Sequence, residues 1–117
     1  MEARMQDVQV EQAQAAAARR EELVELVELV EGERNELRRI DLLEELAMSL
    51  RSEARLSVGL LDPAYRSLHV DECINISEAA GLGVLPELRD ARIAAEVVYA
   101  ELMGGWEWEE APEEDDD

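Results

Sequence analysis

The sequence predicts an all-α protein, and three observations lead to that prediction. Apolar residues recur every three or four positions through residues 22–60, the spacing of a helix with one buried stripe. Pro63 and Pro86 each stand where a new helix would begin. Aromatic residues make up only 3% of the chain and Phe is absent, so Leu, Val, Ile and Ala must build the core. Such a core suits packed helices better than a β-sandwich.

The first twenty residues are rich in Glu, Gln and Ala, which form helices readily. Their apolar face is thin, so this segment would be marginal alone and ordered by contacts with a partner. We interpret it as the start of a long N-terminal amphipathic helix. The predicted organisation is a helical N-terminal extension over residues 1–20, a helical domain over 21–106 and an acidic, disordered tail over 107–117.

The apolar stripe of the central segment is wider than the seam of a two-stranded coiled coil and suits a helical bundle. A helix this long cannot bury its stripe against two short helices alone. We therefore predict a homo-oligomer, or a subunit of a larger assembly, held by protein contacts. The predicted interface residues are Leu23, Val27, Val30, Leu37, Ile40, Leu43 and Leu50, together with Trp106 and Trp108 after the last helix.

The stripe is interrupted at Gly32–Asn35, and two interpretations remain open. One is a continuous helix with a polar interruption, which is favoured because a single glycine is a weak stop signal. The other is a helical hairpin that turns at Gly32. In either case the polar residues around the break are good helix formers.

The second half of the chain predicts shorter elements. Asp62–Pro63 has the residues of a helix start, with Asp at the N-cap and Pro at the first position. We expect a short helix from Pro63 to about Val70, with Tyr65 and Leu68 facing the core. Beyond it, Ile74 and Ile76 alternate, which indicates a short extended segment.

After this region, Ser77 is a candidate cap for another helical turn, and Gly81 and Gly83 indicate a flexible loop. A C-terminal helix begins at Pro86 and packs against the long helix. It ends before Gly104–Gly105, because glycines commonly follow the last helical turn.

The chain is strongly acidic, with a formal net charge of −19 from 30 acidic residues and 11 arginines. This charge repels nucleic acid and anionic membrane surfaces, so we expect neither as a direct partner. An excess of carboxylates without Lys is typical of proteins from a high-salt cytoplasm. The alternative is a GC-rich genome that favours Arg over Lys.

We expect no secretion signal, because the first residues lack a basic segment followed by an apolar one. No apolar run approaches the roughly 20 residues that a membrane span requires. We expect a location in the cytoplasm or within a viral particle. The single cysteine, Cys73, excludes an internal disulfide.

Potential chemistry is concentrated at His69, Asp71, Glu72 and Cys73. In an extended strand, the spacing would place His69, Asp71 and Cys73 on one side, as in some metal sites. In a helix, His69 and Cys73 would share a face and could touch, as a thiol and its base do. No further ligand cluster or phosphate-binding glycine motif supports either site. We therefore assign no catalytic, cofactor-binding or metal-binding residue.

These observations predict a non-enzymatic structural protein, which acts as a scaffold, adaptor or connector through helix–helix contacts. A virion or head–tail component would fit the size and the acidity. The alternative is an acidic inhibitor that imitates nucleic acid and blocks a basic cleft on a host enzyme.

Overall fold

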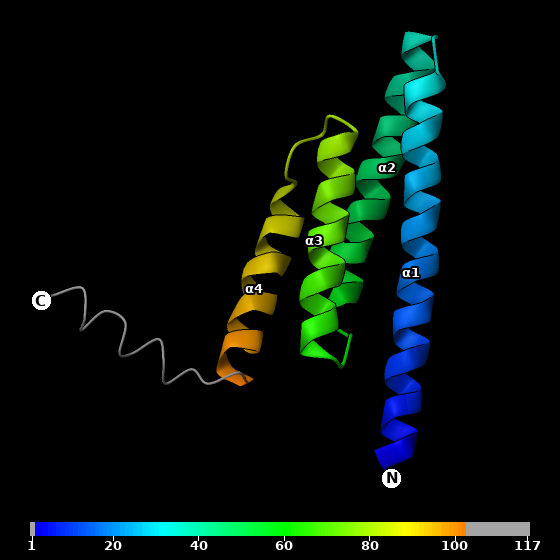
Figure 1. Cartoon of the computed structure of the whole chain (residues 1–117). Helices are drawn as coiled ribbons and strands as arrows, with labels where there is room; N and C mark the ends of the chain where they lie inside the picture. The colour runs from blue at the N-terminus through cyan, green and yellow to red at the C-terminus, as the bar shows by residue number, and fades with distance from the viewer. Residues whose placement is uncertain (1, 103–117) are drawn as a thin grey trace, which may run out of the picture.

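The computed structural model describes residues 2–102 and contains four helices in this part of the chain (Figure 1). They are α1 (Glu2–Gly32), α2 (Glu36–Ser57), α3 (Pro63–Ala79) and α4 (Pro86–Leu102). Between residues 2 and 102 there is no strand, so the predicted all-α fold is confirmed. The predicted helix end at Gly104–Gly105 and the acidic tail lie outside the described residues.

The helices run alternately up and down, with short connections between them (Figure 1). Helices α2 and α3 form a central pair, and each of them packs against all three other helices. Helices α1 and α4 lie on opposite sides of this pair. The core lies between the four helices and contains residues from each of them, including Leu23, Leu50, Val70 and Leu88.

The favoured continuous helix through Gly32 is wrong, and the hairpin alternative is correct. Helix α1 ends at Gly32, and Asn35 caps the start of α2. The Asn35 backbone is extended, and its side-chain oxygen accepts hydrogen bonds from the backbone N–H groups of Leu37 (3.0 Å) and Arg38 (3.2 Å). Asn is among the best N-cap residues, and this signal outweighs the helix propensity of its neighbours.

The predicted start of α3 is confirmed, but its predicted end is wrong. Asp62 caps the helix, with its side chain accepting from the backbone of Ala64, and Pro63 occupies the first turn. The helix continues through the segment predicted to be extended and ends at Ala79. The reason is that Val70, Cys73, Ile74, Ile76 and Ser77 recur at helical spacing, and all five are buried.

Two further expectations for α3 are also corrected. Ser77 does not cap a new helix; it is a buried residue of α3 whose hydroxyl donates to the backbone oxygen of Gly83. Leu68 is half exposed, because it lies on the face of α3 opposite to Cys73. Tyr65 is partly buried and faces α1, where its hydroxyl donates to the backbone oxygen of Ala13.

The turn between α3 and α4 depends on glycine. Gly81 and Gly83 have φ of 84° and 70°, in the left-handed region that residues with a Cβ rarely adopt. The N–H of Leu82 donates to the oxygen of Ser77, and that of Gly81 donates to the oxygen of Glu78. This is the Schellman pattern, which satisfies the last carbonyl groups of α3.

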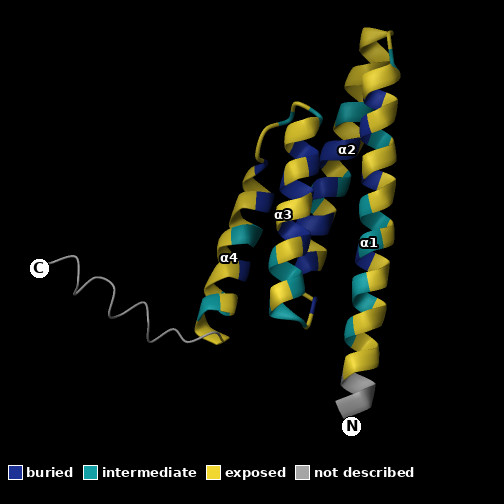
Figure 2. Cartoon of the chain, viewed as in Figure 1, coloured by how far each residue is buried: buried dark blue, intermediate teal, exposed yellow. Residues whose placement is uncertain are grey.

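The α1–α2 hairpin extends beyond the ends of α3 and α4 (Figure 1). We call this projecting part the overhang and define it as residues 29–43. Most of its residues are exposed (Figure 2), and the buried core residues of α2 begin only at Leu46. At the other end, Gln12 of α1 is hydrogen-bonded to the backbone of Gly59 and Leu61, so the predicted N-terminal extension contacts the turn between α2 and α3.

None of the described helices is both long enough and apolar enough to cross a membrane.

Candidate functional site

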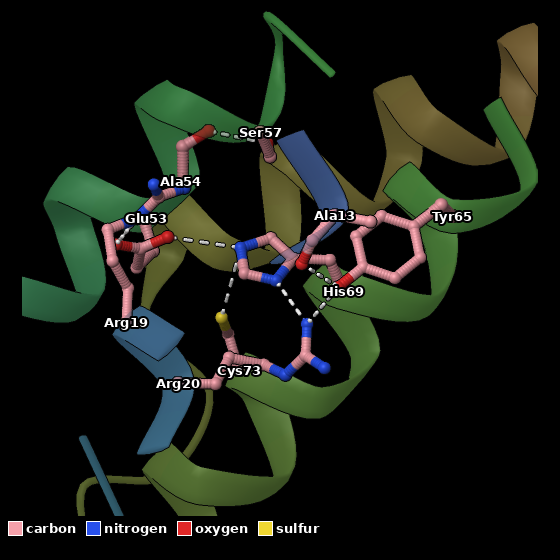
Figure 3. A network of polar contacts seen from close by, with 9 residues as sticks. All are labelled: Ala13, Arg19, Arg20, Glu53, Ala54, Ser57, Tyr65, His69 and Cys73. Atoms are coloured by element: carbon pink, nitrogen blue, oxygen red, sulfur yellow. Dashed lines mark hydrogen bonds and ion pairs between the residues drawn. The ribbon is translucent and has the colours of Figure 1, made fainter. Parts of the chain in front are cut away.

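A network of polar side chains lies inside the bundle, between α1, α2 and α3 (Figure 3). At its centre are Glu53 from α2 and His69 from α3, which are 4% and 0% exposed. Glu53 follows Leu46 and Leu50 on the inner face of α2, where an apolar residue would be expected. Charged residues are rarely buried unless they are paired, so the partners of Glu53 decide what this site can do.

The hydrogen bonds of His69 define which ring nitrogen carries the proton. Nδ1 lies 2.8 Å from Nη1 of Arg20, and because a guanidinium group can only donate, Nδ1 must be the acceptor. Nε2 lies 3.1 Å from Oε1 of Glu53, and because a carboxylate accepts, Nε2 must carry the proton. The arrangement therefore uses the neutral imidazole with its proton on Nε2. In this arrangement His69 donates to Glu53 and accepts from Arg20.

Two consecutive arginines of α1 reach into the network in different directions. Arg19 donates from Nε to Oε2 of Glu53 at 2.7 Å and is partly exposed. The Nη1 atom of Arg20 also donates to the hydroxyl of Tyr65 at 2.9 Å, and its guanidinium lies 5.7 Å from the centre of the Tyr65 ring. The network therefore ties α1 to both α2 and α3. No buried side-chain nitrogen or oxygen in the described part of the chain lacks a hydrogen-bond partner.

The surroundings of Glu53 favour its charged form. Burial alone would raise the pKa of this carboxyl, but the hydrogen bonds from His69 and Arg19 and the charge of Arg19 outweigh burial. The net result is a pKa below the ordinary value of 4.5. Glu53 is thus an ionised carboxylate whose two oxygens are each paired, one with a neutral donor and one with a cation.

The lowered pKa of Glu53 predicts a loss of stability in acid. Because the pKa is lower in the folded state, the contribution of Glu53 is complete above its unfolded value, near 4.5, and declines as the pH falls through the folded value. The free energy of unfolding should be measured by urea denaturation between pH 7 and pH 2.5, for the natural chain and Glu53→Gln. We expect the difference between the two proteins to be constant above about pH 6 and to shrink below 4.5.

Comparing the two proteins removes the effect of the other carboxylates. Those groups also become protonated in acid, which lowers the repulsion within a chain of net charge −19, but they do so in both proteins. A difference that stays the same down to pH 2.5 would contradict a lowered pKa for Glu53.

Cys73 and His69 are in contact, as their spacing on a helix allows, but with Glu53 they do not have the geometry of a catalytic triad. The Sγ atom lies 3.8 Å from Nε2 of His69, which is the same nitrogen that faces Glu53. A catalytic triad needs the nucleophile and the carboxylate on opposite ring nitrogens. Burial, together with the charge of Glu53, also raises the pKa of Cys73 to about 12. The group is therefore a buried thiol and not a reactive thiolate.

The metal site considered for an extended strand has no geometric basis, because residues 69–73 are helical. Asp71 is exposed and Cys73 is buried, so their side chains lie on different faces of α3. In the part of the chain that the structure describes, no group of three or more His, Cys, Asp and Glu side chains is placed to hold a metal ion.

An open groove of about 410 Å³ lies beside the network, between α1 and α2. Arg19 and Glu53 belong to its lining and are paired with each other. The remaining lining consists of carboxylates, serine hydroxyls and leucine side chains: Glu22, Glu45, Ser49, Ser52, Leu23, Leu26 and Leu56. The lining therefore offers hydroxyl and carboxylate oxygens beside an apolar surface.

The residues predicted to form a protein interface fall into three classes. Leu23, Val27, Val30 and Leu50 are buried within this chain. Leu37 and Ile40 are 77% and 50% exposed and belong to the overhang, and the half-buried Leu43 lies beside them. Trp106 and Trp108 lie outside the described residues. The exposed part of the predicted interface is therefore the first two turns of α2.

The sequence did not predict the polar network itself. Glu53 is one of 30 acidic residues, and its partners lie 16 and 34 positions away along the chain. One signal was present, because Glu53 falls on the stripe of Leu46 and Leu50, where a charged residue needs a partner.

No family model, no curated protein and no solved structure matches this chain significantly.

Proposed function

We propose that this protein is a non-enzymatic assembly subunit, an adaptor or connector, which binds a protein partner through the overhang of its α1–α2 hairpin. The observation that carries the proposal is the exposure of Leu29, Leu37 and Ile40, at 58%, 77% and 50%. Leu37 and Ile40 lie one turn apart on α2, and neighbouring exposed apolar side chains are typical of interaction sites.

The interior supports a structural role over a chemical one. No buried side-chain nitrogen or oxygen of the described residues lacks a hydrogen-bond partner, so the buried atoms of the network are engaged in holding the helices together. The central histidine is held in one tautomer, and the thiol beside it keeps its proton. The network thus fixes how α1, α2 and α3 pack, and this in turn holds the overhang in a defined position.

The test compares two leucine substitutions on the surface, in extracts of cells that naturally make the protein. Leu37→Asp alters the overhang, while Leu68→Asp makes the same change at an exposed position of α3 that lies outside it. We expect the natural chain and Leu68→Asp to elute in gel filtration within a complex much larger than 13.2 kDa. Leu37→Asp should elute as the free protein, and a natural chain that itself elutes free would refute the proposal.

A second candidate function, an inhibitor that imitates nucleic acid, gains support from the outer face of α1. Between residues 6 and 33 the only basic residues are Arg19 and Arg20, and both turn toward the network. The exposed charges of the outer face are therefore all negative, and they belong to Asp7, Glu11, Glu21, Glu22, Glu25 and Glu28. The arginines of the chain are mixed with acids in sequence, but on this face they are not.

The density of this charge favours the assembly role over the inhibitor. The six acids span about 32 Å of helix, at a rise of about 1.5 Å per residue. This is roughly one charge per 5 Å, whereas duplex DNA carries one per about 1.7 Å. Displacement of duplex DNA from a basic protein by this chain, lost on Glu21→Gln with Glu25→Gln, would reverse the preference.

A further inference from the structure

The apolar stripe of α2 is only partly covered within this chain. Leu37, Ile40 and Leu43 continue the stripe that includes Leu50 and Ala54, at steps of three and four residues. The C-terminal part of the stripe is covered, because its residues belong to the shared core: Leu46, Ala47, Leu50 and Ala54. The N-terminal part of the stripe, with Leu37 and Ile40, is exposed because it extends beyond α3, which ends at Ala79, and α4, which starts at Pro86 (Figures 1 and 2). A surface that continues the core of a bundle is suited to further helices.

The overhang is also close to electrically neutral. Residues 29–43 contain four acidic residues and three arginines, so their formal net charge is −1, while the whole chain carries −19. Two arginines of α2 are paired locally, Arg38 with Glu33 at 3.3 Å and Arg39 with Glu36 at 3.9 Å. Two identical chains repel each other least where their local charge is near zero. A strongly basic partner, by contrast, would be attracted to the acidic face of α1.

From these two observations we infer that the overhang binds the overhang of a second copy of this chain. The two hairpins together supply four helix ends, which can bury Leu37, Ile40 and Leu43 of both copies against one another. A contact of this kind uses the same surface on both copies and closes with twofold symmetry. The inference rests on the assembly role proposed above, and it identifies a second copy of this chain as a partner in that role.

The size and charge of the contact define how the dimer should behave. Each copy contributes only about three helical turns, so the buried area is at the small end of specific interfaces and the dimer should dissociate on dilution. The remaining charge of both copies is negative and repels at a distance, and salt shortens the range of that repulsion from about 30 Å at 0.01 M to about 3 Å at 1 M. Salt should therefore strengthen the dimer.

The experiment is sedimentation equilibrium of the purified full chain between about 10 μM and 1 mM, in 0.02 M and 1 M salt. We expect a monomer–dimer equilibrium whose dissociation constant is at least tenfold lower in 1 M salt. Leu37→Asp should raise the dissociation constant at least tenfold at both salt concentrations, whereas Leu68→Asp should leave it unchanged. Leu37 lies in the first turn of α2, where an acidic residue is favourable, so Leu37→Asp should retain the fold. Ile40→Asp provides a second substitution on the same surface.

The possible results separate this inference from the proposed function. A purified chain that is monomeric at 1 mM in both salts overturns the pairing of two copies, as does a dimer that Leu37→Asp and Ile40→Asp leave intact. If the chain in cell extracts nevertheless elutes in a large complex that Leu37→Asp disrupts, the assembly role stands with a different partner. If both experiments give only the free monomer, both proposals are wrong.

Discussion

Replacing Glu53 by Ala should lower the free energy of unfolding by about 3–5 kcal/mol, which is the range for breaking a buried pair by removing one partner. The substitution leaves the Nε2 proton of His69 without its carboxylate acceptor and Arg19 without its counter-ion. His69 is fully buried, so no water can replace the lost acceptor, whereas Arg19 is partly exposed and can still be hydrated. Urea unfolding at pH 7, followed by circular dichroism, measures the change.

A matched control separates burial from charge. Glu45→Ala removes a carboxylate from the same helix, but Glu45 is exposed and forms no ion pair among the described residues. Its effect should stay within about 0.5 kcal/mol, as is usual for surface substitutions. If both substitutions had the same small effect, Glu53 would not be a buried, paired group in solution.

A double substitution tests whether the network acts as one unit. His69→Ala alone should also be strongly destabilising, because it leaves Glu53 without its neutral donor. In the double variant, Glu53→Ala with His69→Ala, neither side chain remains to lose its hydrogen-bond partner. The combined loss in the free energy of unfolding should therefore be smaller than the sum of the two single losses. A coupling of about 0.5–3 kcal/mol is typical of residues in one hydrogen-bonded network.

The elements that the sequence predicted correctly are those with a local chemical signal. Asp62–Pro63 and Pro86 define helix starts through residues adjacent to the boundary, and the structure has helices at both places. The turn before α2 was harder to predict because its signal is one side chain, that of Asn35, within a run of strong helix formers. The extent of α3 was missed because Ile74 and Ile76 alone suggest alternation, while Val70, Cys73 and Ser77 show the helical period.

The candidate site could be predicted only where both residues lie on one helix. The contact between His69 and Cys73 follows from their separation of four positions. The contacts of His69 with Arg20 and Glu53 join three helices over 49 and 16 positions, so they depend on how the helices pack. Helix packing also decided which predicted interface residues became core. A hairpin at Gly32 lets α1 and α2 cover each other, and this buries residues that a continuous helix would have left for a partner.

Leu50→Ala tests this assignment to the core, and we expect a loss of about 2–5 kcal/mol in the free energy of unfolding. Leu50 is fully buried among residues of the shared core, so truncation leaves a cavity that rigid helices fill only partly. The same substitution at Leu37, on the same helix but 77% exposed, should change stability by no more than about 0.5 kcal/mol. Urea unfolding of dilute protein, below the concentration at which any dimer forms, measures both.

Leu37 and Leu50 should show the opposite order of effects when self-association is measured in place of stability. Leu37→Ala should weaken self-association, because the side chain lies on the exposed overhang. Leu50→Ala should not change the dissociation constant under conditions where the chain remains folded, because its side chain contacts only residues of its own chain. If Leu50→Ala instead abolished association and left unfolding unchanged, Leu50 would belong to an interface between chains. The C-terminal half of the α2 stripe, around Leu50, would then be open to a partner in solution, and the packing of α3 and α4 over it would be wrong.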